Sequence, residues 1–190
     1  MSARVDIVWL RDDFRIGDQP AIHAATKQPA LFVYVHDAAG GGARLLGGAA
    51  KWRLARSLAA MEVALSARGA RLDIIRGDAE EAILRITAAA NANRVLLTRR
   101  YEGGAKALDA RVEAALRARG VEALSFNGRL MRKPSELTKP DGAPVSIFKA
   151  FWRRHRARPP ARSVASAQTL DPRAMAERCV RARVNRSPEA

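Results

Sequence analysis

Five short apolar runs, separated by longer amphipathic segments, constrain the fold of this chain more than any other feature. The runs are rich in aliphatic and β-branched residues, which is typical of strands buried on both faces of a parallel sheet. They occupy 5–10, 30–36, 72–76, 94–98 and 121–126. Strands that alternate with helices pair in parallel through right-handed crossovers. The pattern predicts an α/β fold: a doubly wound, Rossmann-like, five-stranded parallel sheet in the order 3-2-1-4-5, with helices on both faces.

The segments between these runs show the periodicity of amphipathic helices. In 49–68 large apolar side chains recur at intervals of four, three and four, which places them on one helix face. Similar patterns predict helices at about 19–27, 78–90 and 105–119, and a shorter one at 147–156. Asp78, with Glu81 three residues later, resembles a capping box and is the expected N-cap of the helix at 78–90. Asp18 is the expected N-cap of the first helix, because its carboxylate can accept a first-turn N–H and Pro20 suits the position that follows.

Charge and composition divide the chain into three parts. We expect an α/β domain at 1–128, an interdomain-type linker with a short helix at 129–160, and a basic, disordered tail at 161–190. The formal net charge is +15, and residues 149–190 hold eleven Lys and Arg against three Asp and Glu. Such a field attracts polyanions, so non-specific binding of DNA is one interpretation. The other interpretation is that the chain is simply rich in Arg and has no nucleic-acid partner.

The single cysteine and the short apolar runs bear on the compartment. Cys179 has no second cysteine with which to form an intramolecular disulfide, which favours a reducing compartment. No apolar run approaches the ~18–20 residues that span a bilayer. We therefore expect a cytoplasmic protein that does not bind membranes.

The carboxyl ends of the strands mark the expected ligand site. In the order 3-2-1-4-5 the winding reverses between the first strand, which ends at Leu10, and the fourth, which ends at Thr98. Ligands of open α/β sheets bind outside the carboxyl ends of the strands at such a point. The expected walls of this site are 11–18, 36–48 and 98–104.

The sequence itself supplies no catalytic or metal-binding pattern. Its three histidines have no carboxylate or cysteine at metal-ligand spacing, so no metal site is expected. Neither a phosphate-cradling Gly-x-x-x-x-Gly-Lys nor a Gly-x-Gly-x-x-Gly is present. The charges of Arg11, Asp13 and Arg15 have two interpretations: contacts to a ligand, or ion pairs that shape the first loop.

The stretch from Val5 to Ile22 resembles the opening of the photolyase and cryptochrome family. That family has the form Trp-Phe-Arg-Arg/Lys-Asp-Leu-Arg-x-x-Asp-Asn-x-Ala-Leu at its first strand and loop. The matching residues are Trp9, Arg11, Asp13, Arg15, Asp18, Ala21 and Ile22. Phe14 replaces Leu, Asp12 replaces the second basic residue and Gln19 replaces Asn.

Further segments extend the resemblance over about 5–155. The stretch 48–58 is similar to the family's second helix, and 98–102 with Asp109 is similar to its later loop and the Asp of the helix that follows. Residues 146–152 are similar to the family's linker. In the family this linker leads into a large helical domain that binds FAD and lesion-bearing DNA, and the sequence shows no match to that domain.

The resemblance implies a link with light-driven DNA repair or blue-light sensing, and no catalytic residue within this chain. The family enzyme is deoxyribodipyrimidine photo-lyase, and we expect the chain alone to be inactive. The α/β domain of the family is its antenna half. The implied cofactor is therefore an antenna chromophore, either 8-hydroxy-deazaflavin, methenyltetrahydrofolate or FMN, with FAD belonging only to the helical domain.

Five residues are the candidate cofactor contacts that the resemblance and the predicted topology indicate together. Arg11 and Lys51 would meet a phosphate or carboxylate, while Asp37 and Glu102 would hold ring edges, with Asp13 beside them. Two departures from the family stand in the same loop, since Arg100 and Gly103 occupy positions where an acidic or amide side chain and a Pro are expected.

Two other classes of function stay open. A generic module could bind an adenine nucleotide at the same site, and an electrostatic nucleic-acid binder could act through Arg153 to Arg186. The resemblance also implies partners, because Phe148, Phe151 and Trp152 would dock against the family's FAD-binding domain. Without that cover we expect these side chains to promote self-association.

Overall fold

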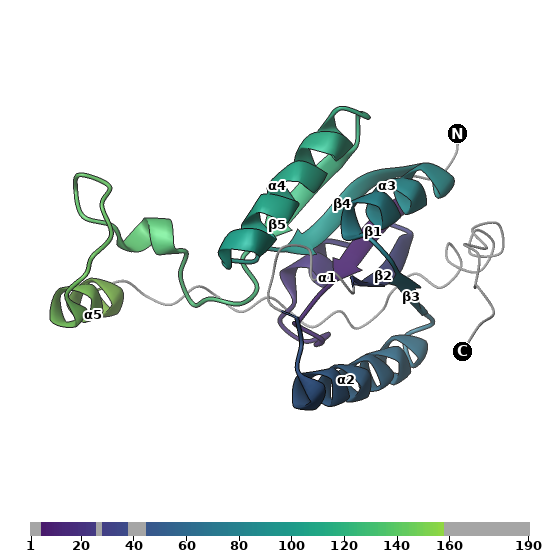
Figure 1. The fold of residues 1–190 in the computed structure, drawn as a ribbon, viewed down its shortest axis with the longest axis horizontal. Coiled ribbons are helices and arrows are strands. Elements are labelled where there is room, and N and C mark those ends of the chain that lie inside the picture. The colour runs from purple at the N-terminus through teal and green to yellow at the C-terminus, as the bar shows by residue number, and fades with distance from the viewer. Residues whose placement is uncertain (1–4, 26–27, 38–44, 158–190) are drawn as a thin grey trace.

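The computed structural model describes residues 5–25, 28–37 and 45–157, and its centre is a five-stranded sheet (Figure 1). All neighbouring strands pair in parallel, in the order β3-β2-β1-β4-β5. The strands are β1 (Val5–Leu10), β2 (Ala30–His36), β3 (Leu72–Arg76), β4 (Ala92–Thr98) and β5 (Glu122–Phe126). The predicted fold class and strand order are confirmed.

The helices fall close to the predicted segments. They are α1 (Pro20–Ala25), α2 (Gly48–Ser66), α3 (Ala79–Ala89), α4 (Gly103–Arg117) and α5 (Phe148–Arg156), with a 3-10 turn, η2 (Pro134–Leu137). The N-cap prediction for α3 is confirmed, since the Asp78 carboxylate accepts the Glu81 N–H at 2.9 Å. The N-cap prediction for α1 is one residue off. Gln19 directly precedes the helix, and its side-chain carbonyl accepts the Ala21 N–H at 3.2 Å.

The conformation of Asp18 explains that correction. Its backbone lies in the left-handed region at φ 52°, a conformation that Asp adopts more readily than most residues. The chain therefore turns sharply before the helix, and Arg15 fixes the turn by donating from Nη2 to the Asp18 carbonyl oxygen at 2.8 Å. Gln19 is buried as a result and becomes the residue that precedes α1.

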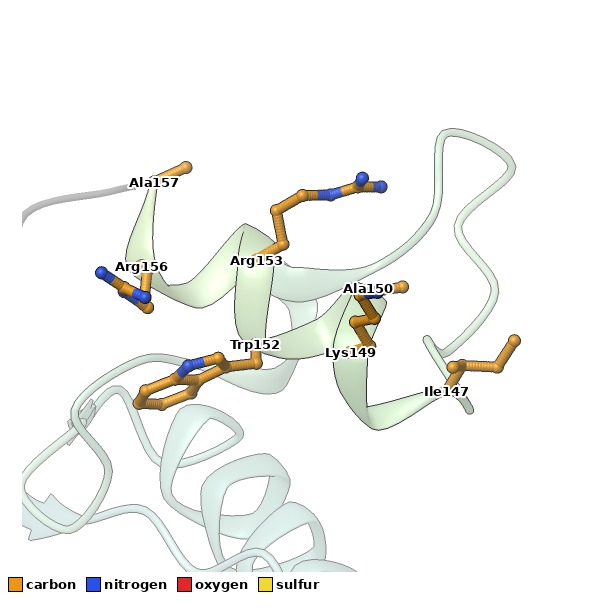
Figure 2. A pocket seen from close by; sticks show the side chains of 7 residues that line it. All are labelled: Ile147, Lys149, Ala150, Trp152, Arg153, Arg156 and Ala157. Atoms are coloured by element: carbon orange, nitrogen blue, oxygen red, sulfur yellow. The ribbon is translucent and has the colours of Figure 1, made fainter.

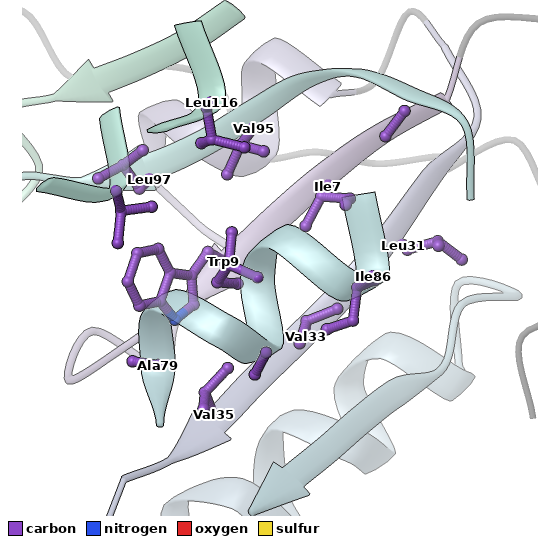
Figure 3. Close-up of a cluster of buried hydrophobic side chains, with 14 of the residues drawn as sticks. Ile7, Trp9, Leu31, Val33, Val35, Ala79, Ile86, Val95, Leu97 and Leu116 are labelled. Carbon is purple, nitrogen blue, oxygen red and sulfur yellow. The ribbon is translucent and has the colours of Figure 1, made fainter. Parts of the chain in front are cut away.

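Two apolar clusters cover the two faces of the sheet. On one face Val8, Leu10 and Phe32 pack with side chains of α1 and α2. On the other face Ile7 and Trp9 pack with side chains of α3 and α4 (Figure 3). Alternate residues of β1 thus enter opposite clusters, as the two-residue period of a strand requires. The central strand is completely buried, which is why its sequence is almost continuously apolar.

One charged residue of β1 is buried at the amino end of the strand. Asp6 has no exposed surface and receives hydrogen bonds from Arg94 of β4, at 2.8 Å from Nε and 2.5 Å from Nη2. These two residues are direct partners in the ladder between β1 and β4. The pair therefore fixes the register of the two central strands at the end of the sheet opposite the expected ligand site.

The linker carries α5 away from the sheet (Figure 1). Arg154 donates from Nη1 to the Thr138 carbonyl oxygen at 2.8 Å, which ties α5 to the segment after η2. Phe148 and Trp152 of α5 are exposed. The predicted disorder of the tail at 161–190, and most of the predicted wall at 36–48, lie outside the described residues.

Candidate functional site

The loop after β1 and the loop after β4 meet at the carboxyl edge of the sheet. The two strands are ladder partners up to Trp9 and Leu97, so Arg11 and the segment from Thr98 to Arg100 leave the sheet side by side. The crossover from β1 leads to β2 on one side, whereas β4 lies on the other. This edge is the predicted point where the winding reverses, and it collects most of the buried charge of the described residues.

A buried arginine and aspartate form the centre of this edge. Arg11 Nη1 donates to both carboxylate oxygens of Asp109, at 2.7 and 2.8 Å. Arg100 Nη2 donates to Asp109 Oδ1 at 3.0 Å, so one carboxylate of α4 receives two guanidinium groups. The Arg11 guanidinium also lies 3.9 Å from the ring centroid of Trp9, a cation–π distance.

The charge of Arg11 is incompletely compensated. Burial lowers the pKa of Arg11 to about 10, and the attraction of Asp109 offsets only part of this effect, while the nearby Arg100 lowers the pKa further. The Nε and Nη2 groups of Arg11 and the Nε of Arg100 are buried and have no hydrogen-bond partner among the described residues. Buried donors of a charged group that lack a partner carry a desolvation cost. The edge therefore contains cationic donors that could form hydrogen bonds to an anion.

A second polar group braces the loop beside this pair. Thr98 Oγ1 donates to Asp13 Oδ2 at 2.6 Å, and Gln19 Nε2 donates to the same oxygen. Gly128, after β5, packs against this group so closely that a Cβ there would lie 3.1 Å from Thr98 Cγ2. Arg15 Nη2 donates to the Gly128 carbonyl oxygen at 2.6 Å, which closes the loop over the edge.

The structure separates the five predicted contact residues into two groups. Arg11 and Asp13 are buried together, and Asp13 adds to the negative potential that Arg11 experiences. Asp37 is half-buried directly after β2, whereas Lys51 is exposed in the first turn of α2. Glu102 is exposed at the residue before α4. These locations do not test whether the five residues contact a cofactor, so that role stays a prediction.

The contacts of Glu102 differ from those of a helix cap. Its Oε2 accepts the backbone N–H of Tyr101 at 3.0 Å, and its Oε1 lies 3.6 Å from Arg129 Nη1. Backbone hydrogen bonding is the main reason that the pKa of Glu102 is lowered. The carboxylate is therefore charged at neutral pH and holds the loop before α4 in place.

Sequence reasoning missed two of the residues that organise this edge. Gln19, directly before α1, and Thr98, at the end of β4, bind the Asp13 carboxylate. Thr98 lies within a predicted wall, but uncharged residues at such positions give no strong signal of this role. Asp109 entered only through the family resemblance. A signal for it did exist, because it follows Leu108 and precedes Val112 by one helical turn and so adjoins the apolar face of α4. A carboxylate at such a position indicates a buried cationic partner.

Other kinds of site are not indicated within the described ranges. In 5–25, 28–37 and 45–157 no three His, Cys, Asp or Glu residues gather as metal ligands. No helix in these ranges has the length and apolar character needed to cross a membrane.

The strand order and the helices on both faces define a doubly wound α/β domain, and comparison with known proteins gives its family. A sequence model of the DNA photolyase family matches residues 6–171. The chain belongs to the DNA photolyase family. The residues that carried the sequence resemblance lie within the matched region.

Two curated relatives show how much of a family member the chain represents. It is 36% identical over 149 residues to a deoxyribodipyrimidine photo-lyase of Agrobacterium fabrum, covering 77% of this chain and 30% of the relative. It is 32% identical over 155 residues to cryptochrome-1 of Arabidopsis thaliana, covering 80% of this chain and 23% of the relative. The chain thus spans about a third or less of the relatives' length.

Solved structures give the same result. A bacterial class III photolyase from Agrobacterium tumefaciens matches with a TM-score of 0.82 and 32% identity, over 90% of this chain and 35% of that one. An archaeal photolyase from Sulfolobus tokodaii, whose description mentions two FAD molecules and a novel light-harvesting cofactor, matches with a TM-score of 0.61 and 17% identity, over 85% of this chain and 37% of that one. The second match shows the fold alone.

The buried pair at the edge can be tested by removing its negative charge. Substitution Asp109→Asn keeps the side-chain shape but leaves Arg11 and Arg100 without a counter-ion, so we expect the free energy of unfolding to fall by about 3–5 kcal/mol. Urea denaturation followed by circular dichroism measures this loss. The matched control is Asp73→Asn, which breaks the exposed pair with Arg71 and should cost less than about 1 kcal/mol. Equal losses for the two variants would contradict the role given to Asp109.

Proposed function

We propose that this chain is a light-harvesting module whose carboxyl edge holds a flat, anionic pigment. The observation that carries the proposal is the pair of Arg11 donors, Nε and Nη2, which are buried beside the end of β1 without a partner among the described residues. A ligand phosphate or carboxylate on these donors would form charge-assisted hydrogen bonds, which are among the stronger ones in proteins. It would also offset the burial cost that lowers the pKa of Arg11.

The candidate pigments share the chemistry that these residues would recognise. An 8-hydroxy-deazaflavin, a methenyltetrahydrofolate and FMN are each conjugated, flat and anionic. Arg11 and Arg100 would receive the anionic group, and the exposed Lys51 would meet a second negative charge. Asp37 and Glu102 would accept hydrogen bonds from ring edges, while Asp13 would hold the loop in place through Thr98. When bound, the pigment would absorb light and pass the excitation to a flavin.

We propose further that light-driven repair requires polypeptide beyond these 190 residues. The chain spans 30% of the Agrobacterium photo-lyase and 23% of the Arabidopsis cryptochrome. The FAD-binding partner, whether in the same chain or in another, belongs to this proposal.

Pigment binding predicts selective stabilisation of the fold. Thermal denaturation of the purified chain should shift to higher temperature with one of the three pigments, and the pigment's absorbance should remain with the protein after gel filtration. Substitution Lys51→Ala should weaken binding about tenfold, because it removes one charge-assisted contact. The control Arg85→Ala removes an exposed charge in the middle of α3 and should leave the affinity unchanged. Stabilisation by ATP or AMP in preference to all three pigments would instead favour an adenine-nucleotide module and overturn the proposal.

The requirement for further polypeptide predicts an inactive chain in photorepair. Purified protein, supplied with FAD and the pigment that it binds, should leave pyrimidine dimers in ultraviolet-irradiated DNA intact under blue light. A product assay by chromatography of the digested DNA, with and without light, measures this. Light-dependent loss of dimers in the presence of this chain alone would refute the proposal.

A further inference from the structure

Directly after β5 the chain forms a short turn at residues 127–130, the linker turn, at the carboxyl edge of the sheet. The side chain of Asn127 shapes it. Asn127 Oδ1 accepts the Leu130 N–H at 3.3 Å, and Asn127 Nδ2 donates to the Leu130 carbonyl oxygen at 2.8 Å. Asn commonly fixes turns by such bonds between its side chain and nearby backbone groups. The linker turn is therefore a defined structure and not a slack connection.

The linker turn contacts both of the loops that meet beside Arg11. From the loop after β1, Arg15 Nη2 donates to the Gly128 carbonyl oxygen at 2.6 Å. From the loop after β4, Tyr101 Oη donates to Asn127 Oδ1 at 3.0 Å. The linker turn thus spans the two loops and is bonded to each of them.

Arg129 of the linker turn joins the same two loops through their carboxylates. Its Nη1 donates to Asp12 Oδ2 at 3.3 Å and lies 3.6 Å from Glu102 Oε1. Asp12 directly follows Arg11, while Glu102 lies two residues after Arg100, whose guanidinium shares the Asp109 carboxylate with Arg11. One guanidinium therefore bridges two carboxylates that would repel each other without it.

Burial separates these contacts from those of Arg11. The side chain of Arg11 is 5% exposed, and its two donors without a partner are buried. The side chains of Arg129, Asp12 and Glu102 are 34%, 52% and 57% exposed. A buried ion pair is costly to break, whereas exposed ion pairs contribute little. The contacts of Arg129 are therefore the ones that open first when the edge moves.

We infer that Arg129 is a latch that controls access to the buried donors of Arg11. While it bridges Asp12 and Glu102, the two loops are held together and Arg11 is enclosed. When the linker turn moves away, the two carboxylates repel each other and the loops separate. Loop opening of this kind sets the rates at which ligands enter and leave a site. Displacement of the linker is thereby coupled to the carboxyl edge.

A hollow of about 580 Å³ beside α5 is a separate feature of the linker (Figure 2). Its lining residues all lie between Ile147 and Ala157, so it includes no part of the linker turn or of the two loops. Access to Arg11 therefore does not run through this hollow. Only the statement that the latch controls a pigment rests on the proposed function, because the enclosure of Arg11 can be measured without a ligand.

Arginine side-chain NMR of the full chain without ligand tests the latch. Arg129→Gln and Asp12→Asn should each speed the exchange of the Arg11 Nε–Hε proton with water by about 3-fold to 10-fold, since each breaks an exposed ion pair. The two variants change the net charge in opposite directions, so a common increase is not an effect of overall charge. The double variant should match Arg129→Gln, because both substitutions break the same contact.

The matched control is Arg111→Gln. It breaks another exposed arginine ion pair, with Glu80 at 3.2 Å, which joins α4 to α3. This variant should leave the exchange rate of the Arg11 proton within about twofold of the wild type, because it removes a similar ion pair without touching the two loops. Arg129→Lys keeps the charge and should show a smaller increase than Arg129→Gln.

Stopped-flow fluorescence with FMN and with methenyltetrahydrofolate tests control of the pigment. Arg129→Gln should raise the association and dissociation rates together, by about 3-fold to 10-fold, and leave the affinity within about twofold. Arg129 acts here through the two loops and not as a contact of the pigment. If neither compound binds the wild type, the proposed function fails, and the exchange rate of the Arg11 proton still decides whether the latch exists.

Three results would overturn the inference. The first is an exchange rate of the Arg11 proton that neither Arg129→Gln nor Asp12→Asn changes. The second is an equal increase in Arg111→Gln, which would show a general loosening of the fold. The third is a loss of pigment affinity in Arg129→Gln with an unchanged exchange rate, which would make Arg129 a direct contact of the pigment.

Discussion

The buried contact between Arg11 and Asp109 joins the two halves of the doubly wound sheet. Arg11 follows β1, while Asp109 lies in α4, which covers the other half, and 98 positions separate them in the chain. The contact therefore closes a long loop around the point where the winding reverses. Trp9 supports the guanidinium from one side, and Arg100 brings the loop after β4 to the same carboxylate. The geometry of the carboxyl edge follows from these contacts.

The same arrangement gives the edge its chemical character. One buried carboxylate cannot accept hydrogen bonds from all the donors of two guanidinium groups, so some donors have no partner among the described residues. Burying these donors without a partner costs free energy. Asp13 supplies a second negative charge, but its carboxylate is already engaged by Thr98 and Gln19. A fold that needed only stability could satisfy Arg11 completely with local acceptors. Donors left without a partner at the carboxyl edge are what a preformed anion site would contain.

Sequence reasoning could predict the architecture because the signal for each strand lies in its own consecutive residues. Both faces of β1 and β2 are buried, so their residues are apolar almost without interruption, and the alternation with helices then predicts parallel pairing in a doubly wound sheet. The N-cap of α3 was equally local, since Asp78 and Glu81 lie one turn apart. The cap of α1 was misplaced by one residue because the left-handed turn at Asp18 depends on contacts made by Arg15, including one with Gly128 that is distant in sequence.

The candidate site could be predicted only in outline. Topology indicated which loops meet, and both Arg11 and Asp13 do lie there. Their partners could not be inferred from spacing, because Asp109 and Thr98 come from elements far along the chain. Nor could spacing show that Lys51 stays exposed on α2 while Arg11 is enclosed. Burial is a property of the assembled layers, and it decides which charged groups are left with unused donors.

The unused donors of Arg11 are the central claim, and arginine side-chain NMR observes them directly. The Nε–Hε resonance of Arg11 can be assigned by its absence from an Arg11→Lys variant and then followed while a pigment or an analogue of its anionic group is added. The account predicts a change in the chemical shift of this proton and slower exchange with water on binding. A bound pigment that leaves both the shift and the exchange rate of the Arg11 Nε–Hε group unchanged would contradict it.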